Sequence, residues 1–420
     1  MSFETISVIG LGYIGLPTAA MFASRKKKVI GIDVNQHAVD TINKGQIHIV
    51  EPDLDMIVSA AVSEGYLKAS TIPEPADAFL IAVPTPFLPC KKGEVPSPDL
   101  SYIEAATKAI APVLKKGDLV ILESTSPVGA TETMAAWLAE LRTDLSFPQT
   151  QGEVADINIA HCPERVLPGH VVRELVENDR VIGGMSNRCS ERSVELYKTF
   201  VLGECVVTNA RTAEMAKLTE NSSRDVQIAF ANELSIICDK LDINVWELIA
   251  LANRHPRVNI LQPGPGVGGH CIAVDPWFIV SNTPEEAQLI KTAREINDFK
   301  ANWVVDKVRR MIISYLDENP TITSDDIVIT CYGLTFKANI DDMRESPAKY
   351  IYDELKSSHK GIVQAVEPNL DFIDEDNVNL VELEYALKKS HIHVMLVDHN
   401  EFKDLVIDSN YLIDTKGIVK

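Results

Sequence analysis

The stretch ISVIGLGYIG, residues 6–15, decides how the first part of the chain folds. Its first four residues predict a buried strand, and the turn after them carries three glycines in the spacing G-x-G-x-x-G: Gly10, Gly12 and Gly15. Glycine suits a tight turn, a close approach of backbone N–H groups to a pyrophosphate, and close packing of the next helix. The next predicted strand, 29–32, leads to Asp33, whose carboxylate would bind a ribose 2′-hydroxyl. The pattern predicts a site for NAD rather than NADP, because Asp33 would repel a 2′-phosphate.

Apolar strands and helix-like segments alternate from this turn to about residue 200. Strands are expected at 79–83, 119–122 and 157–160, and helices at 102–114 and 132–141. This alternation is typical of a parallel, doubly wound sheet, whose ligands bind beyond the carboxyl ends of the strands. Hydroxyl side chains follow two of these strands, so they are candidates to line a cofactor crevice, although each turn taken singly would more often be a capping turn: Thr85, Thr125 and Ser126.

One long helix is predicted over 212–239, a segment without proline or glycine. Apolar positions lie on more than one side of it, which suggests a homodimer built on this helix, although a fully buried helix in a monomer would show the same pattern. Helical patterns continue at 245–252 and 284–313, on either side of an irregular glycine- and proline-rich segment, and strands and helices alternate again over 327–413.

The fold class expected is therefore α/β, with two Rossmann-like doubly wound parallel sheets joined by a central helical domain that contains one long helix. The domains expected are a dinucleotide-binding Rossmann domain at 1–205, a central helical domain at 206–318 and a second, smaller nucleotide-type domain at 319–420.

Composition narrows the classes of function. The chain has 420 residues, of which 45% are hydrophobic and 24% charged, as in ordinary globular proteins. Its net charge of −20 would repel a phosphate backbone, so nucleic acid is not an expected partner. Seven scattered cysteines without a C-x-x-C pair indicate reduced thiols in a cytoplasmic protein rather than disulfides or a zinc finger. No apolar run approaches 18 residues and no export signal is evident, so no membrane span is expected.

Three polar residues of the long helix, Lys217, Asn221 and Arg224, fall on one helical face. A solvated polar face is the usual explanation of such a stripe. The functional alternative is a lysine and an asparagine that hold a substrate hydroxyl beside a nicotinamide, with the lysine or a water that it orients as general base.

Cys271 is the most specific chemical candidate. It ends the run PGPGVGGHC, residues 263–271, in which four glycines would let the backbone wrap closely around a ligand and leave the thiol bare. Asp275 follows four residues later. The other six cysteines are expected to be buried and inert. A metal site at His270 and Cys271 is disfavoured, because ligands at suitable spacing are missing.

The second sheet opens with YGLTFK, residues 332–337, followed by DDMRESP, residues 341–347. A strand, a glycine turn and a helix that starts after Ser-Pro suit a phosphate at the helix N-terminus, with Lys337 and Arg344 in reach.

Together these motifs resemble the UDP-glucose/GDP-mannose dehydrogenase family over essentially the whole chain. The resemblance lies in the G-x-G-x-x-G turn, the K-x-x-x-N of the long helix, the G-G-x-C-x-x-x-D loop and the G-L-x-F-K-x-x-x-x-D-x-R-x-S-P segment, in the family's order. Within the family, NRHPRVN at 253–259 and the run ending at Cys271 are similar to the branch that acts on 2-acetamido sugars.

The resemblance implies a UDP-binding C-terminal domain, a UDP-sugar substrate and roles for individual residues. Those implied to contact NAD are Gly10, Gly12, Tyr13, Ile14, Gly15, Asp33, Thr85, Thr125 and Ser126, with Arg344 reaching it too, from the same or a partner subunit. Those implied to bind the substrate are Arg165, Val166, Arg224, His255, Arg257, Gly268, Phe336, Lys337 and Lys416. Those implied to act in catalysis are Cys271, Lys217, Asn221, Asp275 and Glu164, the last aiding hydrolysis. The loop 87–98, with Cys90, is longer than expected in close relatives, and no role is assigned to it.

The reaction this implies is a four-electron oxidation of the sugar C6 alcohol. Lys217, or a water held by Lys217 and Asp275, takes the hydroxyl proton, and Cys271 captures the aldehyde as a thiohemiacetal that a second NAD oxidises to a thioester. Two alternatives remain: a two-electron β-hydroxyacid dehydrogenase, which leaves the cysteine loop unexplained, and a catalytically silent NAD-binding sensor.

Overall fold

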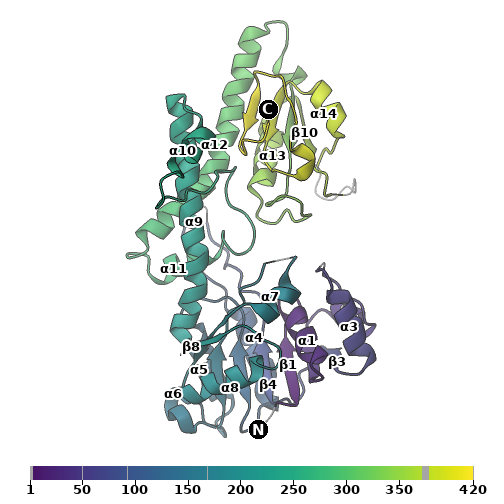
Figure 1. The fold of residues 1–420 in the computed structure, drawn as a ribbon, viewed down its shortest axis with the longest axis vertical. Helices are drawn as coiled ribbons and strands as arrows, with labels where there is room; N and C mark the ends of the chain where they lie inside the picture. The colour runs from purple at the N-terminus through teal and green to yellow at the C-terminus, as the bar shows by residue number, and fades with distance from the viewer. Residues whose placement is uncertain (1–2, 50, 92, 168, 371–377, 420) are drawn as a thin grey trace. The chain divides into compact units, whose positions relative to one another are not determined.

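The computed structural model describes residues 3–49, 51–91, 93–167, 169–370 and 378–419. The chain forms two compact units, residues 1–220 and residues 221–420 (Figure 1). In the described part of the chain, no helix is both long and apolar enough to cross a lipid bilayer.

The first unit is built on a sheet that has eight strands among the described residues, in the order β3-β2-β1-β4-β5-β6-β7-β8. Their bounds are β1 Thr5–Ile9, β2 Lys28–Ile32, β3 Leu67–Ser70, β4 Ala78–Ile81, β5 Leu119–Leu122, β6 Asn158–His161, β7 Arg180–Gly184 and β8 Cys205–Asn209. The first six strands are parallel, as expected. However, β7 pairs antiparallel with β6, and β8 runs parallel to β7. The sequence patterns identified neither this reversal nor strands β3, β7 and β8.

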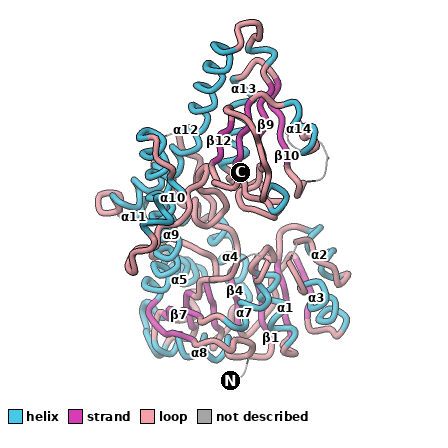
Figure 2. The backbone as a smooth tube through the Cα atoms, turned by 45° about the horizontal axis from the view of Figure 1, so that its top comes forward, coloured by secondary structure: helices cyan, strands magenta, loops and turns pink. Residues whose placement is uncertain are grey.

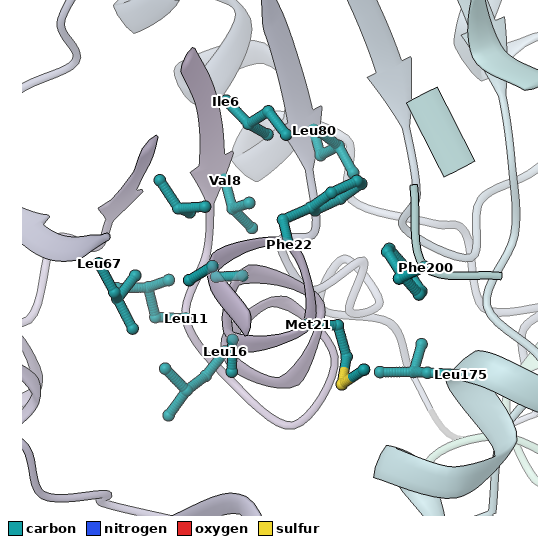
Figure 3. Close-up of a cluster of buried hydrophobic side chains, with 14 of the residues drawn as sticks. Ile6, Val8, Leu11, Leu16, Met21, Phe22, Leu67, Leu80, Leu175 and Phe200 are labelled. Atoms are coloured by element: carbon teal, nitrogen blue, oxygen red, sulfur yellow. The ribbon is translucent and has the colours of Figure 1, made fainter. Parts of the chain in front are cut away.

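Helices cover both faces of this sheet. They are α1 Gly15–Ser24, α2 Gln36–Asn43, α3 Leu54–Ser63, α4 Ser101–Ile110, α5 Ala130–Leu141, α6 Pro148–Gln151, α7 Val171–Glu177 and α8 Asn187–Tyr197. Alternate residues of β5 enter two separate hydrophobic clusters, because successive strand side chains point to opposite faces. In the cluster of Figure 3, Phe22 of α1 lies beside Ile6 and Leu80 of the sheet, and Met21 lies beside Leu175 of α7.

The second unit contains two long helices. α9 spans Ala210–Leu241, so it begins in the first unit and ends in the second, and α12 spans Gln288–Glu318. Between them lie α10, Val245–Ala252, and α11, Asp275–Asn282. α12 runs five residues past the predicted end of its segment, so the region holds a second long helix in addition to the expected one.

A parallel sheet of four strands, in the order β10-β9-β11-β12, forms the rest of the described part of this unit (Figure 2). Its strands are β9 Val328–Tyr332, β10 Ile362–Val366, β11 Ile392–Met395 and β12 Leu412–Asp414, covered by α13 Pro347–Ser358 and α14 Leu383–Lys389. Val304 and Val308 of α12 are buried in the same hydrophobic cluster as Ile329 of β9. The second long helix therefore helps to form the core of the C-terminal sheet.

Each sheet has a point where the strand order reverses, between β1 and β4 in the first and between β9 and β11 in the second. Open α/β sheets bind ligands in the crevice beyond the carboxyl ends of the strands at such a point. The glycine turn at Gly10 and the glycine turn at Gly333 both lie there.

Candidate active site

In the first turn, two glycines are required by close packing, and the third lies beside open space. Gly10 has φ +91°, and a Cβ added to it would lie 2.5 Å from the carbonyl oxygen of Ala82. A Cβ on Gly15 would lie 1.8 Å from the carbonyl oxygen of Gly10, so both residues are required by packing. A Cβ on Gly12 would meet nothing within 4 Å. The open space at Gly12 is therefore where a pyrophosphate can approach the backbone.

The side chain of Asp33, directly after β2, is hydrogen-bonded to the backbone of this turn. Its Oδ2 accepts a hydrogen bond from the backbone N–H of Leu11 at 2.9 Å, and its Oδ1 accepts one from Asn35 at 2.8 Å. The side chain remains partly exposed, so a ribose hydroxyl can still reach it. Tyr13, which is 42% exposed, and Ile14 lie within the turn, between Gly12 and Gly15.

The hydroxyl residues after β4 and β5 supply a test of whether a cofactor fits here. Thr85 Oγ1 and Ser126 Oγ are buried, and neither has a hydrogen-bond partner among the described residues. A buried hydroxyl without a partner costs about 1–3 kcal/mol, so these two atoms favour a polar ligand that would satisfy them. The neighbouring Ser124 instead donates to the carbonyl of Val83 at 2.6 Å, while Thr125 is partly exposed. The residues present fit NAD.

Glu164 lies three residues beyond β6 and is buried. Its Oε2 pairs with Arg180 at 2.8 Å and its Oε1 accepts from the backbone N–H of Arg165 at 2.7 Å. The Arg165 side chain pairs with Glu220 at 2.6 Å, and Val166 packs against the hydrophobic cluster under α1.

Three residues of this region, Glu123, Arg180 and Tyr197, were not predicted from the sequence. Arg180 also approaches Glu123, whose carboxyl accepts a hydrogen bond from the hydroxyl of Tyr197 at 2.9 Å. The only signal for Glu123 was an acid directly after a fully apolar strand. Nothing in the sequence pairs it with Arg180.

Within residues 221–420, the structure joins Asn221, Asp275 and the Cys271 turn. Asn221 Nδ2 donates to Asp275 Oδ2 at 2.5 Å, and the backbone N–H of Asp275 donates to the carbonyl of Cys271 at 2.8 Å. Asp275 is 3% exposed, whereas the Cys271 side chain is exposed. Lys217 lies one turn before Asn221 on α9 and is partly exposed, and Arg224 is exposed.

The glycines before Cys271 are explained by packing against the C-terminal sheet region. A Cβ on Gly268 would lie 2.4 Å from the carbonyl oxygen of Glu345 and 2.8 Å from Phe336 Cβ. Gly269 has φ +81° and faces the ring of Phe336. The sequence suggested that these glycines serve close ligand contact, but these two are needed because the chain itself passes so close.

The remaining predicted substrate residues, and Arg344, which was predicted to contact NAD, all belong to the second unit. Lys416 Nζ pairs with Asp398 at 2.9 Å, and Lys337 is exposed. Arg344 pairs with Asp342 at 2.6 Å. His255 and Arg257 lie on an exposed loop, where the backbone N–H of Arg257 donates to the ring of His255.

The pKa of His270, beside the candidate nucleophile, is lowered by burial and by the charge of Arg344. Within the described residues, no group of three or more His, Cys, Asp or Glu side chains is arranged to hold a metal ion. The loop 87–98 is closed by a backbone bond from Leu88 to Ser97, with Cys90 exposed and Lys92 outside the described residues.

Three domains of one family match the chain in order. The NAD binding domain of the UDP-glucose/GDP-mannose dehydrogenase family matches residues 4–201, its central domain residues 211–299 and its UDP binding domain residues 330–420. The chain belongs to this family. It is an NAD-dependent nucleotide-sugar dehydrogenase, so the family resemblance, the α/β fold class and the NAD cofactor inferred from the sequence are confirmed.

Individual relatives are similar over the full length. The UDP-N-acetyl-D-mannosamine dehydrogenase of Yersinia pestis is 64% identical over 424 aligned residues that cover 100% of both chains. The NDP-N-acetyl-D-galactosaminuronic acid dehydrogenase of Ralstonia nicotianae is 63% identical over 100% of this chain and 97% of its own. Among solved structures, a UDP-N-acetyl-mannosamine dehydrogenase from Staphylococcus aureus has 43% identity and a TM-score of 0.83, covering 99% of this chain and 96% of that one.

Proposed function

We propose that this dehydrogenase oxidises the C6 alcohol of UDP-N-acetyl-D-mannosamine to a carboxylate, forming UDP-N-acetyl-D-mannosaminuronate through a thioester on Cys271. The observation that carries the proposal is an exposed thiol at the end of a glycine-rich loop, tied through Asp275 to the amide of Asn221. A thiol nucleophile suits a reaction in which an aldehyde must be retained and oxidised again, because it can hold the aldehyde as a covalent adduct.

Each step of the proposed reaction is assigned to particular residues of the chain. Lys217 receives the proton of the C6 hydroxyl, while Asn221, fixed by Asp275, holds the sugar oxygen. NAD, when bound, accepts the hydride removed from C6 in each of the two oxidations. The thiolate of Cys271 adds to the aldehyde carbon, and loss of the second hydride leaves a thioester. Water then attacks the thioester, so that a C6–O bond forms, the C6–Sγ bond breaks and the thiol is restored, with Glu164 aiding this hydrolysis.

Binding is assigned to the residues described above. NAD is held by Gly12, Tyr13, Ile14, Asp33, Thr85, Thr125 and Ser126, on turns kept in place by Gly10 and Gly15, with Arg344 as a further contact. The nucleotide sugar is held by Arg165, Val166, Arg224, His255, Arg257 and Gly268, and its UDP end by Phe336, Lys337 and Lys416. The division into domains at 1–205, 206–318 and 319–420 is part of the same proposal.

A second candidate differs only in the sugar. The relative from Ralstonia nicotianae, at 63% identity, is named for an N-acetyl-D-galactosaminuronic acid. UDP-N-acetyl-D-galactosamine is therefore a competing substrate, beside the gluco sugars UDP-N-acetylglucosamine and UDP-glucose. Which sugar the enzyme accepts depends on a few contacts to the hydroxyl and acetamido groups of the sugar.

One assay tests both the chemistry and the sugar. NADH is counted per sugar consumed with the four UDP-sugars side by side, and two NADH with a uronate product are expected for UDP-N-acetyl-D-mannosamine. Cys271→Ala should abolish uronate formation, whereas Cys90→Ala, which removes another exposed thiol, should leave it unchanged. Sustained release of two NADH per sugar by Cys271→Ala would contradict the role of the thiol, and one NADH per sugar would favour a two-electron dehydrogenase.

A homodimer built on α9 is proposed as the working state. Phe230, Ile237 and Leu241 recur on one face of α9 at 52%, 45% and 61% exposure, and a second copy would cover them. Light scattering that gives the mass of two chains supports this, and a monomer at assay concentration contradicts it. The free cysteines suit the reducing cytoplasm, where the product would serve polysaccharide synthesis such as that of enterobacterial common antigen.

A further inference from the structure

The reversed strand β7 brings an arginine to the end of β6. β6 and β7 pair antiparallel, with Ala160 opposite Gly184 and His161 opposite Gly183. Continuing that register by three residues places Arg180, the first residue of β7, opposite Glu164. A parallel neighbour would present the end of its strand at this edge and could not place its first residue here.

Arg180 is shared by two buried acids. Its Nη2 lies 2.8 Å from Glu164 Oε2, and its Nη1 lies 3.4 Å from Glu123 Oε1. Relative exposures are 4% for Arg180, 1% for Glu123 and 8% for Glu164, so water screens none of these charges well. The guanidinium also stacks on the ring of Tyr197, with its central carbon 4.5 Å from the ring centre.

One cation cannot neutralise two carboxylates in a buried site. The pKa of Glu123 is raised to about 7, because burial, which is the largest cause, together with the charge of Glu164 outweighs the opposing charge of Arg180. The other groups that face Glu123 are uncharged near neutrality: the Tyr197 hydroxyl, Thr18 of α1 and the thiol of Cys162, whose pKa burial raises to about 12. Near neutral pH, Glu123 therefore exchanges a proton, and the shorter contact of Arg180 is the one to Glu164.

We propose that Arg180 positions Glu164 for the hydrolytic step, and that Glu123, which competes for the same guanidinium, weakens that hold when it loses its proton. With Glu123 neutral, Glu164 is held at both oxygens, by Arg180 and by the backbone N–H of Arg165. With Glu123 ionised, the guanidinium is drawn toward a second carboxylate, and Glu164 loses part of its orientation. This inference rests on the proposed function, because it concerns breakdown of the Cys271 thioester.

The test measures the two half-reactions separately. The first is the burst of NADH after mixing with NAD and UDP-N-acetyl-D-mannosamine. The second is decay of the acyl adduct on Cys271, measured by acid quench and mass spectrometry of the intact chain between pH 6 and pH 8.5. Glu123→Gln keeps the size and the acceptor oxygen of the side chain but cannot ionise. It should match the natural chain at pH 6 and hydrolyse the adduct about tenfold faster than the natural chain at pH 8.5.

Two further variants separate positioning from structure. Arg180→Lys keeps the charge but loses the fork that reaches both acids, so the adduct should accumulate at every pH while the NADH burst is unchanged. Asp118→Asn is the matched control. Asp118 is a buried acid next to the opposite end of β5, its pKa is also raised by burial, and its removal should leave the pH dependence of hydrolysis unaltered.

Three outcomes decide the inference. An unchanged pH dependence of hydrolysis in Glu123→Gln overturns it, as does an equal loss of both half-reactions in Arg180→Lys. If Arg180→Lys does not fold, the Glu123→Gln comparison decides alone. If the natural chain forms no adduct at all, the proposed function itself fails, and that result is distinct from an adduct with the wrong pH dependence.

Discussion

The turn after β1 and the turn after β9 are closed by the same hydrogen bonds. Gly10 N–H donates to the carbonyl of Ile32 at 2.8 Å and Leu11 N–H to Asp33, while Gly333 N–H donates to the carbonyl of Val366 at 2.9 Å and Leu334 N–H to Glu367. In both, the acid comes directly after the neighbouring strand and also accepts from a backbone N–H two residues on, that of Asn35 or Asn369. We call this arrangement of glycine turn and acid a latch.

The two acids differ in what covers them. Asp33 is partly exposed, whereas Glu367 is 6% exposed and hydrogen-bonded at 3.1 Å to His399 Nε2, in a ring that is fully buried. The backbone N–H of Asn339 can only donate, and it donates to Nδ1 of His399, so the proton of the neutral ring lies on Nε2, facing Glu367. The acid of the first latch is open to the surface, whereas the acid of the second is covered by the protein's own histidine.

The segments after the two turns differ accordingly. α1 begins at Gly15, so the N-terminus of a helix lies directly at the first turn. After the second turn, α13 begins only at Pro347, and the intervening residues carry Phe336, Lys337 and Arg344. The same backbone latch is therefore followed by a helix N-terminus in the NAD binding domain and by a longer loop in the UDP binding domain.

The largest effect should be on stability, when alanine replaces the glycine that opens each of the two turns, Gly10 or Gly333. Gly10→Ala would place a Cβ 2.5 Å from the Ala82 carbonyl oxygen, and Gly333→Ala would place one 2.4 Å from Val397 Cβ, both at positive φ. Each should lower the free energy of unfolding by at least about 2 kcal/mol. Hydrogen exchange measured by mass spectrometry should show lost protection in the variant's own sheet only. Native protection in either variant would show that its latch is dispensable.

Gly12→Ala is the matched control for Gly10→Ala and makes its own prediction. Because a Cβ at Gly12 meets nothing within 4 Å, the sheet should keep its protection from exchange. The added methyl would occupy the approach of the pyrophosphate, so KM for NAD should rise about tenfold, equivalent to about 1.4 kcal/mol. An unchanged KM for NAD, measured at saturating UDP-sugar, would remove Gly12 from the NAD site.

The open latch and the closed latch should respond differently to neutralising their acids. Asp33→Asn keeps an acceptor for the Leu11 N–H but removes the charge that disfavours a 2′-phosphate, so the preference for NAD over NADP should fall severalfold. Glu367→Gln should leave that preference unchanged, since His399 shields the position from ligand. The ratio of kcat/KM for the two cofactors is the measurement, and an equal shift in both variants would contradict the distinction.

The smallest effect concerns acid stability. Burial alone would raise the pKa of Glu367, but hydrogen bonds from His399 and from the backbone N–H groups of Leu334 and Asn369 lower it below its ordinary 4.5. The contribution of the Glu367 carboxylate to the free energy of unfolding is therefore fully present above pH 4.5. It is lost as the pH falls through the lowered pKa of Glu367. Between pH 5 and pH 3 the natural chain should lose about 1 kcal/mol more than Glu367→Gln does, by urea unfolding. If the unfolding free energies of the natural chain and of Glu367→Gln fall in parallel with pH, the charge of Glu367 does not stabilise the fold.

The sequence by itself determined the features that depend on local spacing. The glycine turn, Asp33 at the end of the next strand, the Lys217 and Asn221 stripe, and the loop ending at Cys271 were all found from residue type and interval. These are short-range requirements, because a turn or a helical face is defined within a few residues.

Only the tertiary structure decided which distant groups meet. Arg180 reaches Glu164 because β7 runs against β6, and His399 covers Glu367 because the ends of β10 and β11 lie at the same edge of their sheet. Strand direction and pairing of partners far apart in the chain leave no periodic signal in the residues themselves. They result from the packing of whole elements, which brings buried charges such as Glu164 and Glu367 to partners from other parts of the chain.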